Sequence, residues 1–368
     1  MRITDVRTYL VGANTGEWTD RPRGRNWLFV SVHTDAGLVG YGEGGGWPEI
    51  VQHGIHEITP LLIGENPFDI ERIWFEIYHA LHGHGITGAV RGGVQSAIDI
   101  ALWDLKGKAL GVPVYELLGG RVRDTIQLYT HADSVEQALE LRDKGYTAFK
   151  CGPSVSVLRD IREALGDDAE IGIHCHGEFT VHAAVRLARA AEQYSPAFLE
   201  EPTSPDTMEA LMAVARQVTV PLASGERLYN KWSVFDLIKS GAIALVQPET
   251  TRLGGITELK KTCVLAEASG IHIAPHDGSV GPIVEMANAH VMATTPAFLY
   301  LEHKDDDVPW RYTVVRCAAE VKGGQIPMVD APGLGIELDV EEIERHPAPR
   351  IGEMKCRMAR PEQVQLWK

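Results

Sequence analysis

The stretch that decides the fold is Glu170-Ile171-Gly172-Ile173-His174-Cys175-His176-Gly177-Glu178, which has the pattern of a short buried strand. Side chains on a strand alternate between its two faces, so His174 and His176 are predicted to point the same way and Cys175 the opposite way. Two imidazoles side by side at the carboxyl end of a strand indicate a functional site, although a hydrogen-bonded structural pair has the same pattern. The rest of the chain decides between these interpretations.

Outward from this stretch, short apolar runs recur, and each is followed by an amphipathic helix. The runs predicted as strands are 126–131, 147–151, 170–175, 197–200, 220–224, 243–247, 271–275 and 298–302. The helices predicted between them include 134–145, 155–165, 180–194, 206–217, 231–240 and 256–269. Seven to eight strand–helix units at this spacing predict an α/β fold with a parallel (β/α)7β barrel of the TIM type.

Polar side chains stand where the predicted strands end, and barrel enzymes place their active sites at those ends. These residues are Lys150, His174 with His176, Glu200, Glu226, Glu249, His276 and Glu302. The alternative is a barrel whose strand ends carry charged surface residues without a function. That alternative does not explain so regular a set, because Gly, Asn or Ser would serve equally well in such loops. The set therefore predicts an active site, and we assign Lys150 and Glu302 to its catalytic residues.

Two groups within this set have a defined chemistry. His174, Glu200 and Glu226 are spaced 26 residues apart, one strand–helix unit per step, so neighbouring strands aim them at one point. Carboxylates with an imidazole suit a divalent metal. Glu249 and His276 end the next two strands, and a carboxylate beside an imidazole raises its basicity. This second pair is predicted to be a general base, with a buried structural pair as the alternative.

The chain before the barrel follows a different pattern. Strands are predicted at 2–10, 27–34 and 38–43, and helices at 48–63, 68–81 and 90–110. Strands followed by helices indicate an α+β module. We predict an N-terminal α+β capping domain over 1–120, a barrel over 121–330 that carries the metal and catalytic residues, and a segment over 331–368 that returns to the capping domain.

Two stretches of the N-terminal module are expected to set substrate specificity, namely the polar loop 11–26 and the His/Gly-rich stretch 82–90. The glycine-rich run Gly40–Gly46 faintly resembles a phosphate-binding loop. No parallel strand–helix unit with a later acidic residue follows it, so we discount that function.

The composition of the chain excludes some classes of binding partner. A formal net charge of -15 argues against nucleic acid and against an anionic membrane surface. No apolar run reaches the roughly 18 residues of a membrane span, and the first residues lack the apolar core of a secretory signal. The five cysteines are scattered without a CxxC pair, which is typical of reduced thiols in a cytoplasm. The expected partners are a small-molecule substrate and further copies of this chain in a homo-oligomer.

Motifs along nearly the whole chain resemble one family. In the barrel they are Glu200-Glu201-Pro202, Gly225-Glu226-Arg227, Gly254-Gly255, Ala274-Pro275-His276 and Gly281-Pro282. Outside it they are Gly40-Tyr41-Gly42-Glu43, the stretch 98–108, Leu117-Leu118-Gly119-Gly120 and Pro332-Gly333-Leu334-Gly335. This combination is similar to the enolase superfamily, mandelate racemase subgroup.

Within that subgroup the chain is most similar to the D-galactonate dehydratase branch. The racemase branch carries Lys-x-Lys at the end of the second barrel strand, whereas here Lys150-Cys151-Gly152 lacks the second lysine. The dehydratase branch has a histidine two residues beyond its first metal ligand, and His176 fits that position.

The resemblance implies a metal-dependent acid-sugar dehydratase, a carbon–oxygen lyase. Such an enzyme removes the proton α to a carboxylate through an enediolate and eliminates the β-hydroxyl, leaving a 2-keto-3-deoxy sugar acid. The resemblance assigns proton removal to His276 and protonation of the departing hydroxyl to His176. It places Mg²⁺ on the predicted metal ligands.

Three positions depart from the pattern of the branch. His174 stands where the family normally has Asp, and imidazole suits softer metals than Mg²⁺, so Mn²⁺ or another divalent ion is also expected to bind. Glu249 replaces the usual Asp partner of the base and is one methylene longer. Gly177-Glu178 replaces a common Gly-Arg pair, which would remove a substrate contact.

Two alternatives to the dehydratase stay open at this point. One is a racemase or epimerase of a 2-hydroxy acid, with His176 and His276 on opposite faces of the α carbon. The other is a metal-poor, non-catalytic binding protein that kept the fold. The intact carboxylates and His276 argue against the second alternative, because a binding protein would not need them. The sequence does not name the sugar acid.

Overall fold

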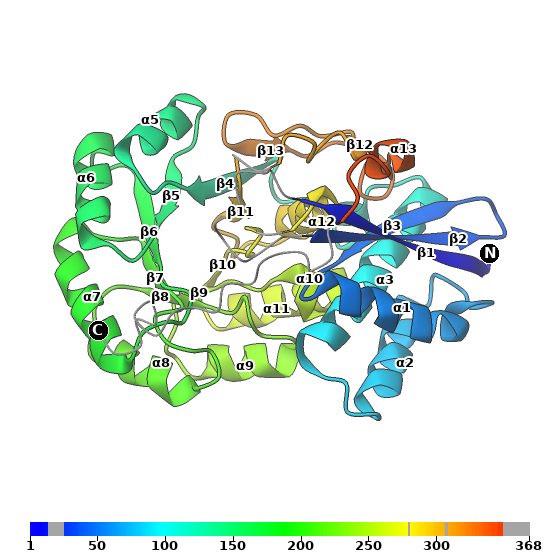
Figure 1. The fold of residues 1–368 in the computed structure, drawn as a ribbon, viewed down its shortest axis with the longest axis horizontal. Coiled ribbons are helices and arrows are strands. Elements are labelled where there is room, and N and C mark those ends of the chain that lie inside the picture. The colour runs from blue at the N-terminus through cyan, green and yellow to red at the C-terminus, as the bar shows by residue number, and fades with distance from the viewer. Residues whose placement is uncertain (14–25, 279, 306–307, 349–368) are drawn as a thin grey trace.

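The computed structural model describes residues 1–13, 26–278, 280–305 and 308–348. An N-terminal α+β unit lies beside a β/α barrel, and the C-terminal segment runs over both (Figure 1). None of the helices in the described ranges is long and apolar enough to cross a membrane.

The N-terminal unit is an antiparallel meander covered by helices. Its strands are β1 (Ile3–Gly12), β2 (Asn26–Thr34) and β3 (Val39–Gly44), and its helices are α1 (Pro48–Leu62), α2 (Ile70–His82), α3 (Gly88–Leu110) and the short α4 (Val114–Leu117). Alternate residues of β2 enter different cores. Leu28 and Val30 pack with the N-terminal helices, whereas Trp27 and Phe29 join the core of the barrel. Strand β2 is therefore buried on both faces, and it ties the two units together.

The barrel is a parallel sheet in chain order, as predicted. Its strands are β4 (Thr125–His131), β5 (Ala148–Cys151), β6 (Glu170–His174), β7 (Phe198–Glu200), β8 (Leu222–Ser224), β9 (Leu245–Val246), β10 (His272–Ile273) and β11 (Leu301–His303). Each strand from β4 to β9 pairs with the next in sequence, and β11 pairs with β4. A bridge between Ile273 and Phe298 joins β10 to the chain that leads into β11, so the sheet curls back on itself. The predicted α/β barrel is confirmed.

The helices around the barrel are α5 (Val135–Asp143), α6 (Val155–Leu165), α7 (Val181–Ala191) with η2 (Glu192–Tyr194), α8 (Met208–Ala215), α9 (Lys231–Lys239), α10 (Thr250–Leu253), α11 (Gly255–Ala268) and α12 (Pro282–Ala293). Side-chain caps fix where several begin, because Ser134, Ser154, Thr180 and Asn230 each accept a backbone N–H of the first turn. Helix α12 was not among the predicted helices. All its residues are buried, so it lacks the polar stripe by which an amphipathic helix is recognised.

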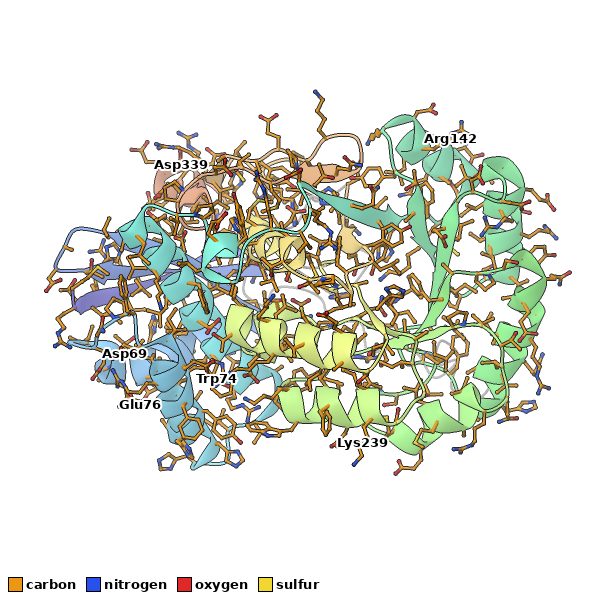
Figure 2. The ribbon with its side chains drawn as sticks, turned by 180° about the vertical axis from the view of Figure 1, so that it is seen from behind. Asp69, Trp74, Glu76, Arg142, Lys239 and Asp339 are labelled. Atoms are coloured by element: carbon orange, nitrogen blue, oxygen red, sulfur yellow. The ribbon has the colours of Figure 1, made fainter. Side chains whose placement is uncertain are left out.

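The two units meet where α2 and α3 pack on α10 and α11. Trp74, labelled in Figure 2, donates from Nε1 to the carbonyl of Gly254 at 2.9 Å. The buried carboxylate of Asp99 accepts the backbone N–H of Thr257 at 3.0 Å. Gly92 has to be glycine here, since an added Cβ would lie 1.7 Å from a backbone oxygen of α10. This seam holds the N-terminal unit against the carboxyl ends of the barrel strands.

The C-terminal segment carries β12 (Val315–Cys317), β13 (Gln325–Pro327), β14 (Ile336–Leu338) and α13 (Val340–Ile343). It returns to the N-terminal unit, because Asp104 of α3 accepts the N–H of Leu334 at 2.8 Å and Gly12 donates its N–H to the His346 carbonyl at 2.9 Å. The domain boundaries given above stay a prediction, and the tail from residue 349 lies outside the described residues.

Candidate active site and metal centre

A cavity of about 440 Å³ lies between the carboxyl ends of the barrel strands and the N-terminal unit. The N-terminal unit contributes Ala13, Asn26, Trp27, Glu43, Gly44, Gly45, Gly46 and Pro48. The barrel contributes His131, Lys150, His174, His176, Glu226, Arg227, Thr251, Arg252, His276, Gly278, Val280, Glu302, Lys304 and Val308.

The two stretches that were expected to set substrate specificity differ in whether they line the cavity. The ends of stretch 11–26 line the cavity through Ala13 and Asn26, and its middle lies outside the described residues. None of the residues in stretch 82–90 is among those that line the cavity, and the turn after α2 is exposed. A role of this stretch in specificity stays a prediction. Glycines 44–46, which we discounted as a phosphate loop, line the cavity with backbone instead.

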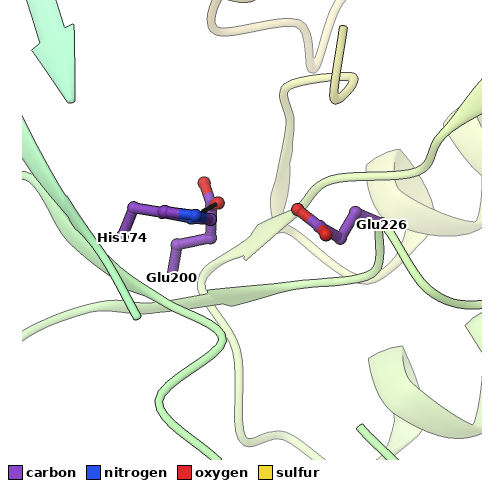
Figure 3. A group of neighbouring side chains, drawn as sticks. All are labelled: His174, Glu200 and Glu226. Carbon is purple, nitrogen blue, oxygen red and sulfur yellow. Dashed lines mark hydrogen bonds and ion pairs between the residues drawn. The ribbon is translucent and has the colours of Figure 1, made fainter. Parts of the chain in front are cut away.

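Three neighbouring strand ends bring the predicted metal ligands together (Figure 3). His174 ends β6, Glu200 ends β7, and Glu226 lies two residues beyond β8. One ligand atom of each lies within 4.8 Å of the other two. The even spacing in the sequence therefore corresponds to a real convergence, and the donor set is one imidazole nitrogen with two carboxylate oxygens.

The carboxylates of this triad differ in their partners. Glu200 is buried and accepts hydrogen bonds from Lys150 Nζ at 2.9 Å, Gln247 Nε2 at 2.6 Å and His174 Nδ1 at 2.5 Å. Burial alone would raise the pKa of Glu200, but Lys150 and His174 hold it below its usual value. Glu226 Oε2, by contrast, is buried and makes no hydrogen bond in the described part of the chain, although His276 Nε2 lies 3.2 Å away. An unsatisfied buried carboxylate oxygen is costly, and a bound cation would remove that cost, so the triad fits a divalent metal.

The two histidines of the opening stretch face the cavity for a reason that the sequence did not reveal. Strand β6 ends at His174, and His176 lies in a turn with a left-handed φ of 53°. The turn is held by the Gly177 N–H, which donates to the Glu201 carbonyl at 2.7 Å. Strand alternation was therefore the wrong argument for these two side chains. The ring centroids nevertheless lie 5.3 Å apart, and both rings line the cavity.

The histidine–carboxylate pair that was predicted to act as a general base is present as a hydrogen-bonded dyad. His276 Nδ1 donates to Glu249 Oε2 at 2.8 Å, and His276 Nε2 lies 3.2 Å from Glu226 Oε2 and 3.7 Å from Glu302 Oε2. Burial lowers the pKa of His276, but the carboxylates of Glu226, Glu302 and Glu249 together raise it to about 10. The extra methylene of Glu249 does not break the dyad, because its other oxygen is anchored by Thr251 Oγ1 at 2.7 Å.

Lys150 and Glu302 form the floor of the cavity. Lys150 Nζ lies 2.9 Å from Glu302 Oε1 and is completely buried, so its charge is shared between two carboxylates. The same Glu302 oxygen accepts a hydrogen bond from His131 Nε2 at 2.8 Å. The pairing of Lys150 with Glu302 balances charge in the site, and their assignment as catalytic residues stays a prediction.

Sequence reasoning missed several residues of this site. His131 ends the first barrel strand, so the strand-end rule would have found it had we applied it to that strand. Arg252 lies in the short helix α10, three residues beyond Glu249, and sequence reasoning assigned it no role in the site. Glu43 accepts the N–H groups of Gly281 at 2.5 Å and Val284 at 3.2 Å, and so caps α12 from the N-terminal unit. No local pattern indicates that last contact, which joins residues far apart in the chain.

Comparisons with known proteins agree with this architecture. Residues 133–343 match the family model of the enolase C-terminal domain-like fold, and residues 23–119 match the mandelate racemase / muconate lactonizing enzyme N-terminal domain. Among curated relatives, D-xylonate dehydratase of Haloferax volcanii is 33% identical, covering 94% of this chain and 88% of the relative. A D-galactonate dehydratase of Xanthomonas euvesicatoria is also 33% identical and covers 94% of both chains.

Solved structures show the same likeness. A mandelate racemase/muconate lactonizing enzyme from a Sulfitobacter species superposes with a TM-score of 0.88 at 32% identity, covering 95% of this chain and 96% of that one. The 3,6-anhydro-D-galactonate cycloisomerase from Zobellia galactanivorans superposes with a TM-score of 0.87 at 28% identity, covering 94% of this chain and 99% of that one.

Proposed function

Since this chain belongs to the mandelate racemase/muconate lactonizing enzyme family of the enolase superfamily, we propose that it is a metal-dependent dehydratase of sugar acids. The observation that carries the proposal is the placing of the His276–Glu249 dyad, whose free nitrogen lies 3.2 Å from Glu226. A proton acceptor beside a metal ligand is the arrangement needed to remove a proton α to a carboxylate.

In the proposed site, His174, Glu200 and Glu226 hold the metal, with Mg²⁺ or Mn²⁺ as the candidates. A divalent metal bound there would stabilise the negative charge that develops on the substrate carboxylate as its α proton leaves. Lys150 and Gln247 keep Glu200 ionised and in position.

His276 is the base of the proposed reaction. Because Nδ1 donates to Glu249, Nε2 is the nitrogen that takes the α proton. The buried Glu249 then stabilises the imidazolium that results. Sharing the charge of Glu226 with a cation lowers the pKa of His276 and favours the neutral imidazole that the reaction requires.

His176 is the acid of the proposed reaction. Removal of the α proton first leaves its electron pair on the substrate as an enediolate. That electron pair then forms a double bond to the β carbon as the bond to the β-hydroxyl breaks. His176 supplies the proton with which that hydroxyl leaves as water, and the enol product tautomerises to a 2-keto-3-deoxy acid. His176 suits this role because its ring lies 5.3 Å from that of His174 and lines the same cavity.

A panel of aldonic and aldaric acids, assayed for 2-keto-3-deoxy products with Mg²⁺ and with Mn²⁺, tests the reaction class. Proton NMR in D2O follows the α position at the same time. We expect both a keto product and α exchange. Exchange without a keto product would instead support racemase or epimerase chemistry, and neither signal with any acid would support the non-catalytic binding protein.

Variants test the two roles separately. His276→Asn should abolish both α exchange and product, because the base is lost. His176→Asn should lower the rate of product formation by roughly 10²–10⁴-fold while leaving exchange of the α proton measurable. His272→Asn is the matched control, since this histidine is exposed at the other end of its strand and does not line the cavity. Normal dehydration by either active-site variant would overturn its assignment.

A further inference from the structure

Four cationic side chains of the barrel line the cavity, namely Lys150, Arg227, Arg252 and Lys304, and Lys304 already has an interaction partner. Lys150 is paired with Glu200 and Glu302, and Arg227 Nε donates to Glu201 Oε2 at 3.0 Å. Arg252 is different. Within the residues that the structure describes, no carboxylate pairs with its guanidinium, and its buried Nε has no hydrogen-bond partner.

The position of Arg252 is fixed by the seam between the two units. Its backbone N–H donates to the Glu249 carbonyl at 3.0 Å, and its own carbonyl packs against Gly92 of α3. The neighbouring Thr251 carbonyl accepts the N–H of Gly45 at 3.1 Å. Arg252 therefore lies on the side of the cavity that the N-terminal unit covers, beside the glycines Gly45 and Gly92.

Burial raises the pKa of the nearby Glu249 and the charge of Arg252 lowers it, but the two side chains form no ion pair in the described part of the chain. Both oxygens of Glu249 are already engaged, one by His276 at 2.8 Å and the other by Thr251 Oγ1 at 2.7 Å. A guanidinium that is partly withdrawn from water and lacks an anion is a binding site for one. Because the described residues supply no such anion, the candidate is an anionic group of a molecule bound in the cavity.

We infer that Arg252 binds a second carboxylate at the far end of the substrate, so that the preferred substrates are aldaric acids rather than aldonic acids. This inference rests on the proposed function, in which the first carboxylate lies beside His276 and the metal ligands. A carboxylate fits better than a phosphate ester, because it matches the planar fork of one guanidinium and carries one charge, whereas a phosphate ester carries about -1.5 to -2.

The test compares acids that differ only at C6, namely galactonate with galactarate, and gluconate with glucarate and 6-phosphogluconate. Wild-type protein should favour the diacid, both in kcat/KM and in calorimetric binding with Mg²⁺ present, by roughly tenfold to hundredfold. Arg252→Gln should remove most of this ratio, and Arg252→Lys should keep part of it, since the charge remains without the fork. Arg159→Gln is the control for charge loss, because Arg159 lies on the exposed face of α6, paired with Asp160.

Several results would overturn the inference. One is equal binding of diacid and monoacid, another is binding of neither, and a third is a diacid preference that survives in Arg252→Gln. Preference for 6-phosphogluconate would replace the carboxylate by a phosphate. Dehydration of aldonates alone would refute the role of Arg252 and leave the proposed function standing. If diacids bind in a manner that depends on Arg252 but no acid is turned over, the proposed function is refuted. The assignment of Arg252 as a carboxylate-binding residue would then still hold.

Discussion

His174 is the residue at which this site differs most from a set of three carboxylates. A neutral imidazole with Glu200 and Glu226 balances a dication, whereas three carboxylates would leave one negative charge in excess. Lys150, buried against Glu200, adds a further positive charge. The site should therefore hold its metal less tightly than an all-oxygen site and should favour metals that accept nitrogen.

His174→Asp should raise Mg²⁺ affinity by at least about tenfold, because one added unit charge within ~4 Å is worth several kcal/mol in a partly buried site. The ratio of Mn²⁺ to Mg²⁺ affinity should fall at the same time. Calorimetric titration of both proteins with each metal measures the two effects. Without metal, the variant should also unfold at a lower temperature than wild type, since the hydrogen bond to Glu200 becomes a repulsion. Identical affinities would mean that His174 does not touch the metal.

At the scale of elements, α3 does more than cover the meander. Gly92 lets it approach α10, Asp99 accepts the N–H of Thr257 in α11, and Asp104 accepts the N–H of Leu334 in the C-terminal segment. Burial raises the pKa of Asp99 to about 7, even though the two hydrogen bonds from Thr257 lower it. The seam beside the active site therefore contains a carboxyl group whose protonation is linked to folding.

This linkage predicts how stability varies with pH. The folded pKa of Asp99 is about 7 and its ordinary value is 3.8, so between those values the folded state binds a proton that the unfolded state has lost. The contribution of Asp99 to the free energy of unfolding should fall as pH rises from about 4 to 7, by up to about 1.4 kcal/mol per unit, and then level off. Asp99→Asn should lack this slope.

Urea unfolding of wild type and Asp99→Asn at half-unit steps from pH 4.5 to 8 measures the difference, because the other titrating groups cancel between them. Parallel stability curves for the two proteins would show that Asp99 is already ionised in the folded state.

At the scale of the whole molecule, the site is assembled from both units and from most of the barrel strands. The proposed metal ligands come from β6, β7 and the loop after β8, and the cavity above them is closed by β2, β3 and the residues that follow β3. A metal bound at their meeting point holds three strand ends together in the folded state only. Metal binding is therefore expected to stabilise the fold as a whole.

Removal of divalent ions with a chelator should lower the unfolding temperature by a few degrees, since ligand at a hundredfold excess over Kd contributes about 2.7 kcal/mol. Adding Mg²⁺ or Mn²⁺ back should restore it. In Glu226→Gln the difference between metal-loaded and metal-free protein should shrink, because one of the two carboxylate ligands is gone. Scanning calorimetry of both proteins provides the measurement. An equal metal-dependent shift in the variant would place the ion elsewhere.

The sequence by itself determined the order of strands and helices, the barrel, and the convergence of His174, Glu200 and Glu226. These follow from local periodicity, because alternation and helical spacing report which face of each element is buried, and parallel units in chain order place their carboxyl ends together. The pairing of Glu249 with His276 was predictable for the same reason, since they follow neighbouring strands.

Only the tertiary structure decided the turn that aims His176 into the cavity and the burial of Lys150 between Glu200 and Glu302. It also left the buried Nε of Arg252 without a hydrogen-bond partner among the described residues. It also decided the return of the C-terminal segment to α3. Each depends on contacts between residues far apart in the chain, formed when the barrel closes and the N-terminal unit packs against it. Local patterns carry no record of such contacts, because the burial of a charged side chain is set by what surrounds it and not by its neighbours in sequence.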